Sequence, residues 1–373
     1  MSTAPRNSVA FTVVVTVAVV CGALVTLLLL ALNGAPGTTL LATVLAALPV
    51  GPVVGAYLWL DRYEPEPKRN LAAGLLWGAF AATAAALFVE GVGGFAVGWT
   101  DTSALALAAP VAEEATKGLF LVMLLWWRRH ELDGILDGIV YAGMVGVGFA
   151  FTENILYLAA AFDGTDGMGP GGVQAITGTF VIRCLFSPFA HPLFTAFTGV
   201  GVGIAVSTRS RALRIVAPVG GYLLAVTAHA IWNGSTVLGF GGFAVVYVVI
   251  MAPAFLGMAG LAWWARETEA HLLRAALTDA AQRGLIPATD IGWVVDLRAR
   301  RIARRHARQS GGAAAERAMR DYQQAAIELG YLHHRLLRGT APKDWQVRGQ
   351  DFVGRIHAAR PRIAFPGQVV PQR

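Results

Sequence analysis

The sequence predicts an all-α fold, a polytopic bundle of about eight transmembrane helices followed by a basic helical tail. Hydrophobic residues make up 55% of the 373 residues and charged residues only 14%, and the mean hydropathy is +0.55. These values are typical of polytopic membrane proteins and argue against an ordinary soluble globular domain. The apolar residues are gathered in segments long enough to cross a bilayer, which takes about 20 residues.

These segments follow one another along the first two thirds of the chain. The predicted spans are residues 10–32, 38–60, 71–89, 103–127, 137–161, 176–207, 215–238 and 241–264. The sixth contains Pro188 and Pro192 and is too long for one straight crossing, so we expect a short interfacial or re-entrant helix before the span itself. The first could be a signal sequence, but its apolar stretch exceeds the ~7–15 residues of a signal core, which favours a membrane anchor.

Positive charge alternates between the predicted loops. Basic residues precede span one and follow spans two, four and six, at Arg6, Arg62, Lys68, Arg69, Arg128, Arg129, Arg209, Arg211 and Arg214. The intervening loops, residues 33–37, 90–102, 162–175 and 239–240, contain no Lys or Arg. Since basic loops stay preferentially in the cytoplasm, we expect a multi-pass protein of the cell membrane with both termini cytoplasmic.

The composition changes abruptly after the last span. From Arg266 onward 19 Lys and Arg residues stand against 10 Asp and Glu residues. We therefore expect two domains, a transmembrane bundle over residues 1–264 and a cytoplasmic helical tail over residues 265–373. Within the tail, periodicity predicts helices at 267–282 and 313–337, breaks at Gly311-Gly312 and Gly339, and an unstructured end at 361–373.

A dense run of arginines lies in this tail. Its members are Arg298, Arg300, Arg301, Arg304, Arg305 and Arg308. Such a run can bind anionic lipid headgroups, at roughly 1 kcal/mol per basic residue, or can simply be a solvated helix face. No recognised DNA- or RNA-binding motif accompanies it, so no nucleic-acid partner is expected.

Polar residues that a lipid-facing helix would not tolerate lie in four of the predicted spans. They are Glu113, Glu114 and Lys117; Glu153 and Asn154; His191; and His229 and Asn233. A charge at the bilayer centre costs ~2.5–3.5 kcal/mol, so such groups normally face a protein interior. Counted at ~1.5 Å per residue, all lie roughly 20–27 Å from the cytoplasmic boundary of their span. The sequence therefore predicts one polar layer, which makes an intramembrane active site the leading hypothesis.

The spacing of these residues suits catalysis. Lys117 follows Glu113 by four positions and Glu114 by three, so one helix face can carry a carboxylate neutralised by an ammonium. A buried carboxylate beside a like charge is a candidate general base towards water. The two glutamates point about 100° apart on a helix, so we expect only one of them to line the site. His229 and Asn233 are again four positions apart, and the amide can orient the imidazole or share a substrate with it.

A metal is one of two ways in which this set can act. Glu153, His191 and His229 are candidate ligands for Zn²⁺ with an open position for water. Alternatively, the histidines donate hydrogen bonds to an oxyanion while a glutamate activates water without metal. Cys21 and Cys184 both lie in predicted spans, so neither a disulfide framework nor a cysteine-rich zinc site is available.

Other polar and small residues have structural interpretations. Arg183 is expected to be structural, either snorkelling or pairing with a carboxylate near the outer half of the membrane. The glycines of two spans, Gly143, Gly146, Gly148, Gly199, Gly201 and Gly203, are expected to permit close approach of helices.

The motif series resembles that of the PrsW-type intramembrane proteases, which are distant relatives of the CAAX prenyl-protease and bacteriocin-immunity group. The matching motifs are Glu113-Glu114-x-x-Lys117, Phe149-x-x-x-Glu153-Asn154, His191-x-x-x-Thr195 and His229-Ala-Ile-Trp-Asn233, with the loop Asp61-Arg62-Tyr63-Glu64-Pro65-Glu66-Pro67. The resemblance covers roughly residues 40–264, and the motifs fall in order on separate spans.

The resemblance implies hydrolysis of a peptide bond in or near the membrane segment of a protein substrate, which in bacterial members is an anti-sigma factor of stress signalling. It implies that Glu113 or Glu114 is the water-activating base and Lys117 its electrostatic partner. Glu153 and Asn154 would form a second polar face, and His191, His229 and Asn233 would contact the transition state or a metal. Two alternatives are a proton- or ion-coupled transporter using the same cluster, and an inactive protein that binds a membrane partner.

Overall fold

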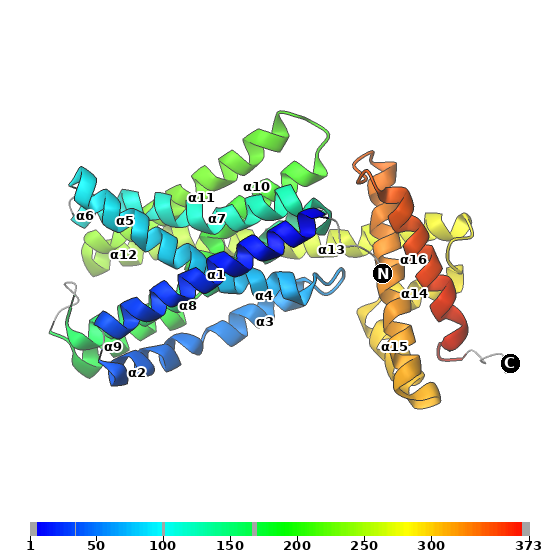
Figure 1. The fold of residues 1–373 in the computed structure, drawn as a ribbon, viewed down its shortest axis with the longest axis horizontal. Coiled ribbons are helices and arrows are strands. Elements are labelled where there is room, and N and C mark those ends of the chain that lie inside the picture. The colour runs from blue at the N-terminus through cyan, green and yellow to red at the C-terminus, as the bar shows by residue number, and fades with distance from the viewer. Residues whose placement is uncertain (1–5, 34, 99–100, 166–169, 368–373) are drawn as a thin grey trace. The chain divides into compact units, whose positions relative to one another are not determined.

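The computed structural model describes residues 6–33, 35–98, 101–165 and 170–367 (Figure 1). Every regular element in these ranges is a helix, which confirms the predicted all-α class. Parts of the predicted charge-poor loops, at residues 34, 99–100 and 166–169, lie outside the described residues. The chain divides into two compact units. The membrane unit comprises Met1–Asp61 and Glu66–Ala262, and the C-terminal unit comprises Arg62–Pro65 and Trp263–Arg373.

The membrane unit is built of long helices, several of which contain a π-helical turn. The α-helices are α1 Arg6–Asn33, α2 Pro36–Ala47, α3 Val50–Leu60, α4 Lys68–Leu76, α5 Thr83–Val97, α6 Asp101–Ser103, α7 Ala109–Trp127, α8 Ile135–Asp163, α9 Gly172–Phe180, α10 Ala190–Ser207, α11 Leu213–Val237, α12 Gly239–Val246 and α13 Ala252–Gln282, which runs on into the C-terminal unit. The π-helical turns are η1 Trp77–Ala82, η2 Ala104–Ala108, η4 Val181–Phe186 and η5 Tyr247–Met251, and η3 Arg129–Glu131 is a 3₁₀ turn.

Seven helical segments of the described residues are long and apolar enough to cross a membrane. They are Val9–Leu32, Pro36–Leu60, Lys68–Ala96, Ile135–Asp163, Gly172–Ser207, Leu213–Val237 and Gly239–Gln282. The remaining predicted span, the fourth at residues 103–127, corresponds to α7, which has 19 residues and carries the three charged residues Glu113, Glu114 and Lys117. The protein is thus a multi-pass membrane protein, as the composition predicts.

The long predicted sixth span is broken where its prolines indicate. The helical path ends with η4 at Phe186, and α10 begins again at Ala190. Between them Ser187 has φ −128° and ψ 35°, outside the helical region, and Pro188 and Phe189 complete the turn. The break directly precedes His191 and so sets the direction from which that side chain enters the bundle.

Helix α8 lies at the centre of the membrane unit. In its apolar window 89% of the residues are buried, against 17% for α1. It packs against α10, α2, α4 and η1. These contacts are close because glycines of α8 face backbone atoms of the neighbouring helices and leave no room for a side chain. A Cβ added to Gly148 would lie 1.9 Å from the Leu75 carbonyl oxygen, and one added to Gly146 would lie 2.6 Å from the Pro192 Cα.

The other predicted glycine contacts are present as well. The remaining four are Gly143, Gly199, Gly201 and Gly203. A Cβ added to any of these glycines would lie closer than 2.6 Å to a neighbouring atom. The glycines of α8 and α10 therefore permit close helix approach, and the prediction is confirmed.

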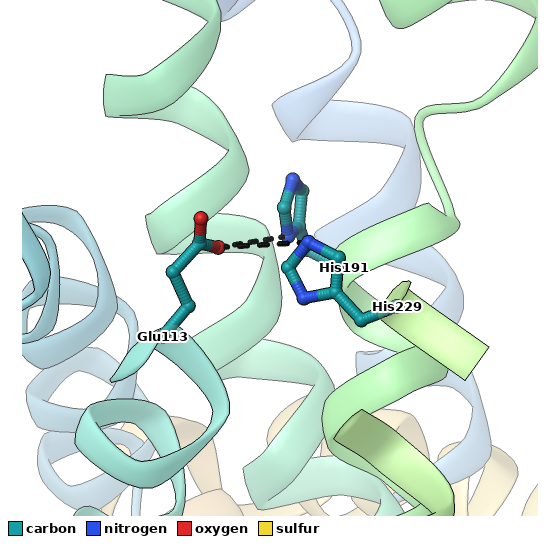
Figure 2. Close-up of side chains that lie close together, drawn as sticks. All are labelled: Glu113, His191 and His229. Carbon is teal, nitrogen blue, oxygen red and sulfur yellow. Dashed lines mark ion pairs between the residues drawn. The ribbon is translucent and has the colours of Figure 1, made fainter. Parts of the chain in front are cut away.

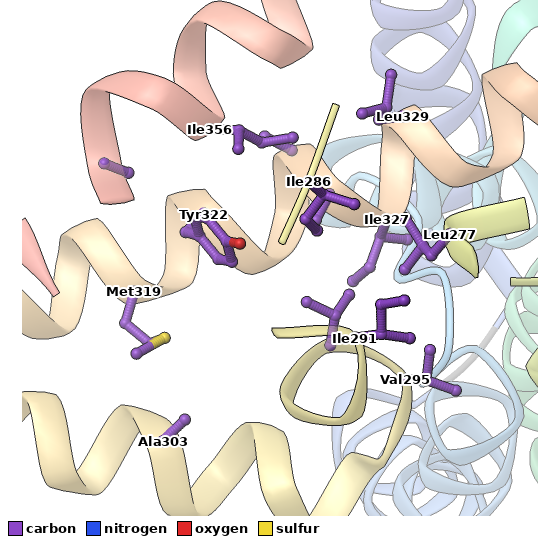
Figure 3. Close-up of a cluster of buried hydrophobic side chains, with 14 of the residues drawn as sticks. Leu277, Ile286, Ile291, Val295, Ala303, Met319, Tyr322, Ile327, Leu329 and Ile356 are labelled. Carbon is purple, nitrogen blue, oxygen red and sulfur yellow. The ribbon is translucent and has the colours of Figure 1, made fainter. Parts of the chain in front are cut away.

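The C-terminal unit has its own apolar core (Figure 3). Its elements beyond α13 are η6 Ala288–Asp290, α14 Ile291–Val295, α15 Leu297–Leu337, α16 Trp345–Ala359 and η7 Arg360–Arg362. Asp296 caps α15 by accepting a hydrogen bond from the Ala299 N–H at 2.6 Å. As predicted, α15 is kinked at the glycine pair, since Gly312 has φ 68° and ψ −161°. Gly339, with φ 66°, follows the end of this helix.

One prediction for the tail is wrong. Residues 361–367 are not unstructured, because Ile363, Ala364 and Phe365 are buried and belong to the apolar core or pack beside it. Nearby, the buried carboxylate of Asp290 accepts hydrogen bonds from the Tyr322 hydroxyl at 2.6 Å and from Arg360 Nε at 2.7 Å. Short apolar segments like this one carry little periodicity from which burial can be predicted. The remainder of the predicted segment, residues 368–373, lies outside the described residues.

Candidate functional site

Six of the eight predicted site residues converge inside the membrane unit. Helix α7 supplies Glu113, Glu114 and Lys117, α8 supplies Glu153, α10 supplies His191 and α11 supplies His229. Figure 2 shows the Glu113 carboxylate and the two imidazoles pointing toward one another from three helices. The predicted polar layer is therefore a single contiguous cluster, drawn from elements up to 116 positions apart in sequence.

Lys117 lies in the middle of the cluster and is fully buried. Its ammonium donates hydrogen bonds to Glu113 Oε2 at 3.0 Å, Glu114 Oε1 at 2.8 Å and His191 Nδ1 at 3.0 Å. These three contacts use all three of its hydrogens. The charge also lies 3.8 Å from the centroid of the Phe149 ring, a cation–π contact.

The two glutamates of α7 have different surroundings. Glu114 is completely buried, and both of its oxygens are engaged: Oε1 with Lys117 and His229, and Oε2 with the Thr195 hydroxyl at 3.1 Å. Glu113 lines a cavity, and its Oε1 accepts no hydrogen bond within the described part of the chain. The expectation that only one of the two lines the site agrees with this arrangement, with Glu113 as the residue that does so.

The partners of the imidazoles fix their tautomers. His191 Nε2 lies 2.5 Å from Glu153 Oε2, and a carboxylate only accepts, so Nε2 carries the hydrogen. Its Nδ1 accepts from Lys117, which only donates. His229 Nδ1 lies 3.0 Å from Glu114 Oε1 and donates to it, which leaves Nε2 unprotonated. Each ring thus has a carboxylate on one nitrogen and an unprotonated second nitrogen, which on His191 accepts from Lys117.

These lone pairs and Glu113 form a possible metal-ligand set. Glu113 Oε2 lies 3.9 Å from His191 Nδ1 and 3.8 Å from His229 Nε2, and the three ligand atoms lie within 4.8 Å of one another. Ligating histidines usually donate their other N–H to a carboxylate or carbonyl, and Glu153 and Glu114 occupy those positions here. The types of donor therefore fit a divalent metal such as zinc, which would have to displace the Lys117 ammonium from Glu113 Oε2 and His191 Nδ1.

The carboxylate of this set differs from the predicted one. Glu153, expected beside the histidines as a ligand, contacts the far nitrogen of His191 and the Arg183 guanidinium at 2.5 Å. It is turned away because α8 places it behind the His191 ring, whereas Glu113 approaches both rings from α7. The carboxylate of the possible ligand set is therefore that of Glu113, whereas the sequence suggested Glu153.

The two predicted amides lie at the edge of the cluster. Asn154 Oδ1 accepts a hydrogen bond from Arg183 Nε at 2.8 Å and does not contact the histidines. Asn233 Nδ2 donates to the Leu105 carbonyl at 3.0 Å and lines the cavity. The i,i+4 spacing predicted that Asn233 lies on the same face as His229, but its hydrogen bond goes to η2.

A cavity of about 1100 Å³ opens beside the cluster. Glu113, Phe149 and Glu153 line its inner part, and Asp163 and Thr165 line it at the end of α8. Apolar residues of α1 and α5 form much of the remaining wall, including Leu29, Leu30 and Leu87. The polar centre is therefore reachable from a large, partly apolar space within the bundle.

Sequence reasoning missed two contributors to the site. Thr195 was noted only as part of a motif, yet it bonds Glu114; its position four residues after His191 on one helix face was the available signal. For Arg183 the sequence predicts a structural role, by snorkelling or by pairing with a carboxylate, and the structure shows the pairing. That carboxylate is Glu153, which contacts His191. Only the isolation of Arg183 in an apolar span indicated more.

Taken together, the helical bundle with its buried carboxylates, imidazoles and ammonium beside a cavity defines a polytopic membrane protein with a buried polar site. The profile of the PrsW family intramembrane metalloproteases matches residues 66–258, which include every residue of the cluster. The chain belongs to this family.

Three individual relatives bear the name Protease PrsW. The chain is 29% identical over 161 residues to the Protease PrsW of Geobacillus kaustophilus, which is 43% of this chain and 65% of the relative. It is 30% identical over 135 residues to Protease PrsW of Oceanobacillus iheyensis, covering 35% of this chain and 54% of that protein. It is 31% identical over 117 residues to Protease PrsW of Clostridioides difficile, covering 30% of this chain and 49% of that protein. The chain thus spans about half to two thirds of these relatives, and no solved structure matches it.

Proposed function

We propose that this protein is an endopeptidase that hydrolyses a peptide bond in or near the membrane segment of a protein substrate. The observation that carries the proposal is the position of Glu113, which lines the cavity and lies within 3.9 Å of an ammonium and two imidazole nitrogens. Family membership supports hydrolysis and does not favour the transporter alternative. As substrate we propose an anti-sigma factor, the substrate class implied by the resemblance of the motifs.

In this proposal Glu113 is the general base. It takes a proton from a water molecule in the cavity while the water oxygen attacks the carbonyl carbon of the scissile bond. The same carboxyl group then returns the proton to the amine as the carbon–nitrogen bond breaks. Lys117 offsets the charge of Glu113 and Glu114, and in a low-dielectric interior it also favours the negative charge that develops on the carbonyl oxygen.

In the alternative, metal-dependent chemistry, a divalent metal, for which Zn²⁺ is our candidate, would be held by Glu113, His191 and His229. When bound, it would polarise the carbonyl group and lower the pKa of water. The roles of the surrounding residues follow from the contacts described above. Glu114 holds His229 in the tautomer with an unprotonated Nε2, and Glu153 does the same for Nδ1 of His191.

The cavity is the proposed substrate site. Glu153 and Asp163 both line it and are ten positions apart on α8, which corresponds to about 15 Å along a helix. An extended peptide rises ~3.3 Å per residue, so this length accommodates about four or five substrate residues on one side of the scissile bond. Its apolar walls suit a segment drawn from the membrane.

The distribution of charge supports the proposed orientation and lipid contacts. We propose that both termini and the C-terminal unit are cytoplasmic, because Lys and Arg are confined to alternate loops and eight crossings would return the chain to the side of those loops. Four arginines of the basic run, Arg298, Arg301, Arg305 and Arg308, are exposed and recur at helical spacing. We propose that they bind anionic lipid headgroups.

The test is cleavage of single-pass membrane substrates by the purified protein in liposomes. We expect the wild type to cut at least one substrate, and Glu113→Gln to lose the activity. Chelation followed by re-addition of Zn²⁺ separates the two chemistries, since only the metal-dependent one is abolished and then restored. A folded wild type that cleaves no membrane substrate, including anti-sigma factors, would contradict the proposal.

A further inference from the structure

We propose that Arg183 is a positioning residue that fixes, through Glu153, which ring nitrogen His191 presents to the centre of the site. The inference rests on the proposed function for its catalytic consequence, whereas its structural consequence can be measured independently. Arg183 does not touch the cavity side of the cluster. It acts, in this proposal, only through the carboxylate behind the imidazole.

A continuous chain of hydrogen bonds connects Arg183 to the centre. Arg183 Nη2 donates to Glu153 Oε2 at 2.5 Å, and the same oxygen accepts from His191 Nε2 at 2.5 Å. On the other side of the ring, Nδ1 accepts from Lys117, which also holds Glu113. The orientation of the imidazole is therefore set by two fixed ions on its two sides.

The guanidinium itself is held at three places. Besides Glu153, it donates from Nε to Asn154 Oδ1 at 2.8 Å, and its carbon lies 3.9 Å from the centroid of the Tyr157 ring. Asn154, Glu153 and Tyr157 all belong to α8, so Arg183 lies along that helix. Its planar fork satisfies the two acceptors and the ring at once, which a lysine ammonium cannot do equally well.

The backbone at Arg183 is suited to this reach. The residue lies within the π-helical turn η4, and such turns insert an extra residue and redirect the following side chains. The turn ends at Phe186, immediately before the break that leads to His191. One short segment thus delivers both the guanidinium and the imidazole to the same oxygen, Glu153 Oε2.

Loss of the guanidinium should release the ring. Without Arg183, Glu153 keeps His191 Nε2 as a partner but has no second contact to hold its carboxylate in place. The ring can then rotate out of its contacts with Glu153 and Lys117, and once these contacts no longer fix the proton on Nε2, it can lose that proton to solvent and take one up on Nδ1. A purely structural arginine would instead stabilise the fold without affecting the imidazole.

The experiment is ¹⁵N NMR of histidine-labelled protein in lipid nanodiscs at one fixed pH, with the His191 signals assigned by comparison with His191→Gln. We expect the wild type to show the tautomer protonated on Nε2 only, Arg183→Gln a mixture of tautomers, and Arg183→Lys a partial return to one. Arg128→Gln is the matched control, since Arg128 also pairs with a glutamate but is buried outside the cluster, whereas Arg183 is partly buried. A single unchanged tautomer in Arg183→Gln, or another tautomer in the wild type, would overturn the proposal.

Kinetics provides the second readout. We expect Arg183→Gln to lower kcat by roughly 10- to 100-fold, as loss of residues behind a catalytic imidazole usually does, with KM within about twofold. The double variant Arg183→Gln with Glu153→Gln should be no slower than Glu153→Gln alone, since both changes remove one interaction. Additive losses would contradict action through Glu153. If the wild type cleaves nothing, the proposed function fails, but the NMR comparison still decides the role of Arg183.

Discussion

At the scale of the residue, the adjacent glutamates of α7 show how environment separates two identical side chains. Glu114 has ionic or hydrogen-bonding partners on both oxygens and no exposed surface, whereas Glu113 keeps one oxygen without a partner in the described structure and borders the cavity. The first is thus arranged for holding Lys117 and His229 in place. The second is arranged for reaction.

Substitution of these two residues should therefore have different effects. We expect Glu113→Gln to lower kcat by about 10²–10⁴-fold while the protein stays folded, because the variant loses a general base. Glu114→Gln breaks a fully buried ion pair, a change that costs about 3–5 kcal/mol, and should lower the thermal stability in detergent. Cleavage rates and melting curves check both, with Glu131→Gln as a carboxylate control outside the site. Equal loss of stability in the two variants would argue against the assigned roles.

Titration at the end of the second span should affect stability. Burial raises the pKa of Asp61 from 3.8 to about 8, against the opposing backbone hydrogen bond from Glu66. The folded state thus keeps a proton that the unfolded state loses above about pH 4, so stability should fall as the pH rises from about 4 through 8. Burial and the nearby Asp137 also raise the pKa of Glu66, which acts in the same direction.

Replacement of Asp61 by asparagine, its neutral isostere, tests this titration. We expect Asp61→Asn to flatten the decline of the melting temperature between about pH 5 and pH 8, because the variant cannot ionise there. Glu66 remains, so some slope should persist. The measurement is thermal unfolding across this pH range in one detergent, and parallel curves for wild type and variant would show that Asp61 does not titrate as described.

At the scale of the element, helix contacts in the membrane unit depend on backbone approaching backbone. Gly148 of α8 and Gly78 of η1 each leave no space for a Cβ, which would lie 1.9 Å from a carbonyl oxygen of the facing segment in both cases. Since α8 carries Glu153, the same contacts set the distance between this carboxylate and its neighbours. Packing and geometry of the site are therefore coupled through glycine.

A single added methyl group should reveal this coupling. We expect Gly148→Ala to destabilise the protein by about 1–3 kcal/mol, the usual effect of overpacking, and to lower activity as α8 shifts. Gly94→Ala is the control, because nothing lies within 4 Å of the added carbon. Thermal unfolding and cleavage assays of the two variants make the comparison. A Gly148→Ala variant as stable as Gly94→Ala would contradict the packing argument.

The exposed arginine face of α15 gives a second prediction for an element. Arg300 turns inward, where its Nη1 donates to the Tyr63 carbonyl at 3.0 Å, and the four exposed arginines form the available surface. We expect hydrogen exchange of this helix to slow when anionic lipid is added to the nanodiscs, and salt or replacement of all four by Gln to abolish the effect. Equal exchange in neutral and anionic nanodiscs would leave a solvated helix face as the better description.

At the scale of the whole molecule, hydropathy and helical periodicity in the sequence predicted most of the architecture. Spans and glycine contacts follow from local patterns, and the polar layer follows from helical rise. What could not be predicted are contacts between distant positions, such as Arg183 with Glu153 and Glu113 with His229. The π-helical turns change the direction of later side chains and leave no periodic signal. For the same reason Glu113 rather than Glu153 approaches both imidazoles.

The proposed orientation can be tested with the whole protein in cells. We expect a membrane-impermeant maleimide to label a cysteine at position 173 in intact cells, and one at Lys68 only after permeabilisation. Both positions are exposed, and the first lies in a predicted loop without basic residues. The native pair Cys21 and Cys184 is replaced by Ala in both variants as background. The reverse labelling pattern would invert the assigned topology.

The deep burial of α8 has one further consequence. The helices around it, such as α1, α2 and α12, expose most of their apolar surface, so they are the ones that meet lipid. Adjustments to bilayer thickness, which proceed by tilting or bending of lipid-facing segments, fall on this outer ring. Helix α8, which carries Glu153, is surrounded by protein and does not take part in these adjustments. The cluster should therefore keep its geometry in thin and thick membranes alike, while the entry of a substrate past the outer ring varies with the lipid.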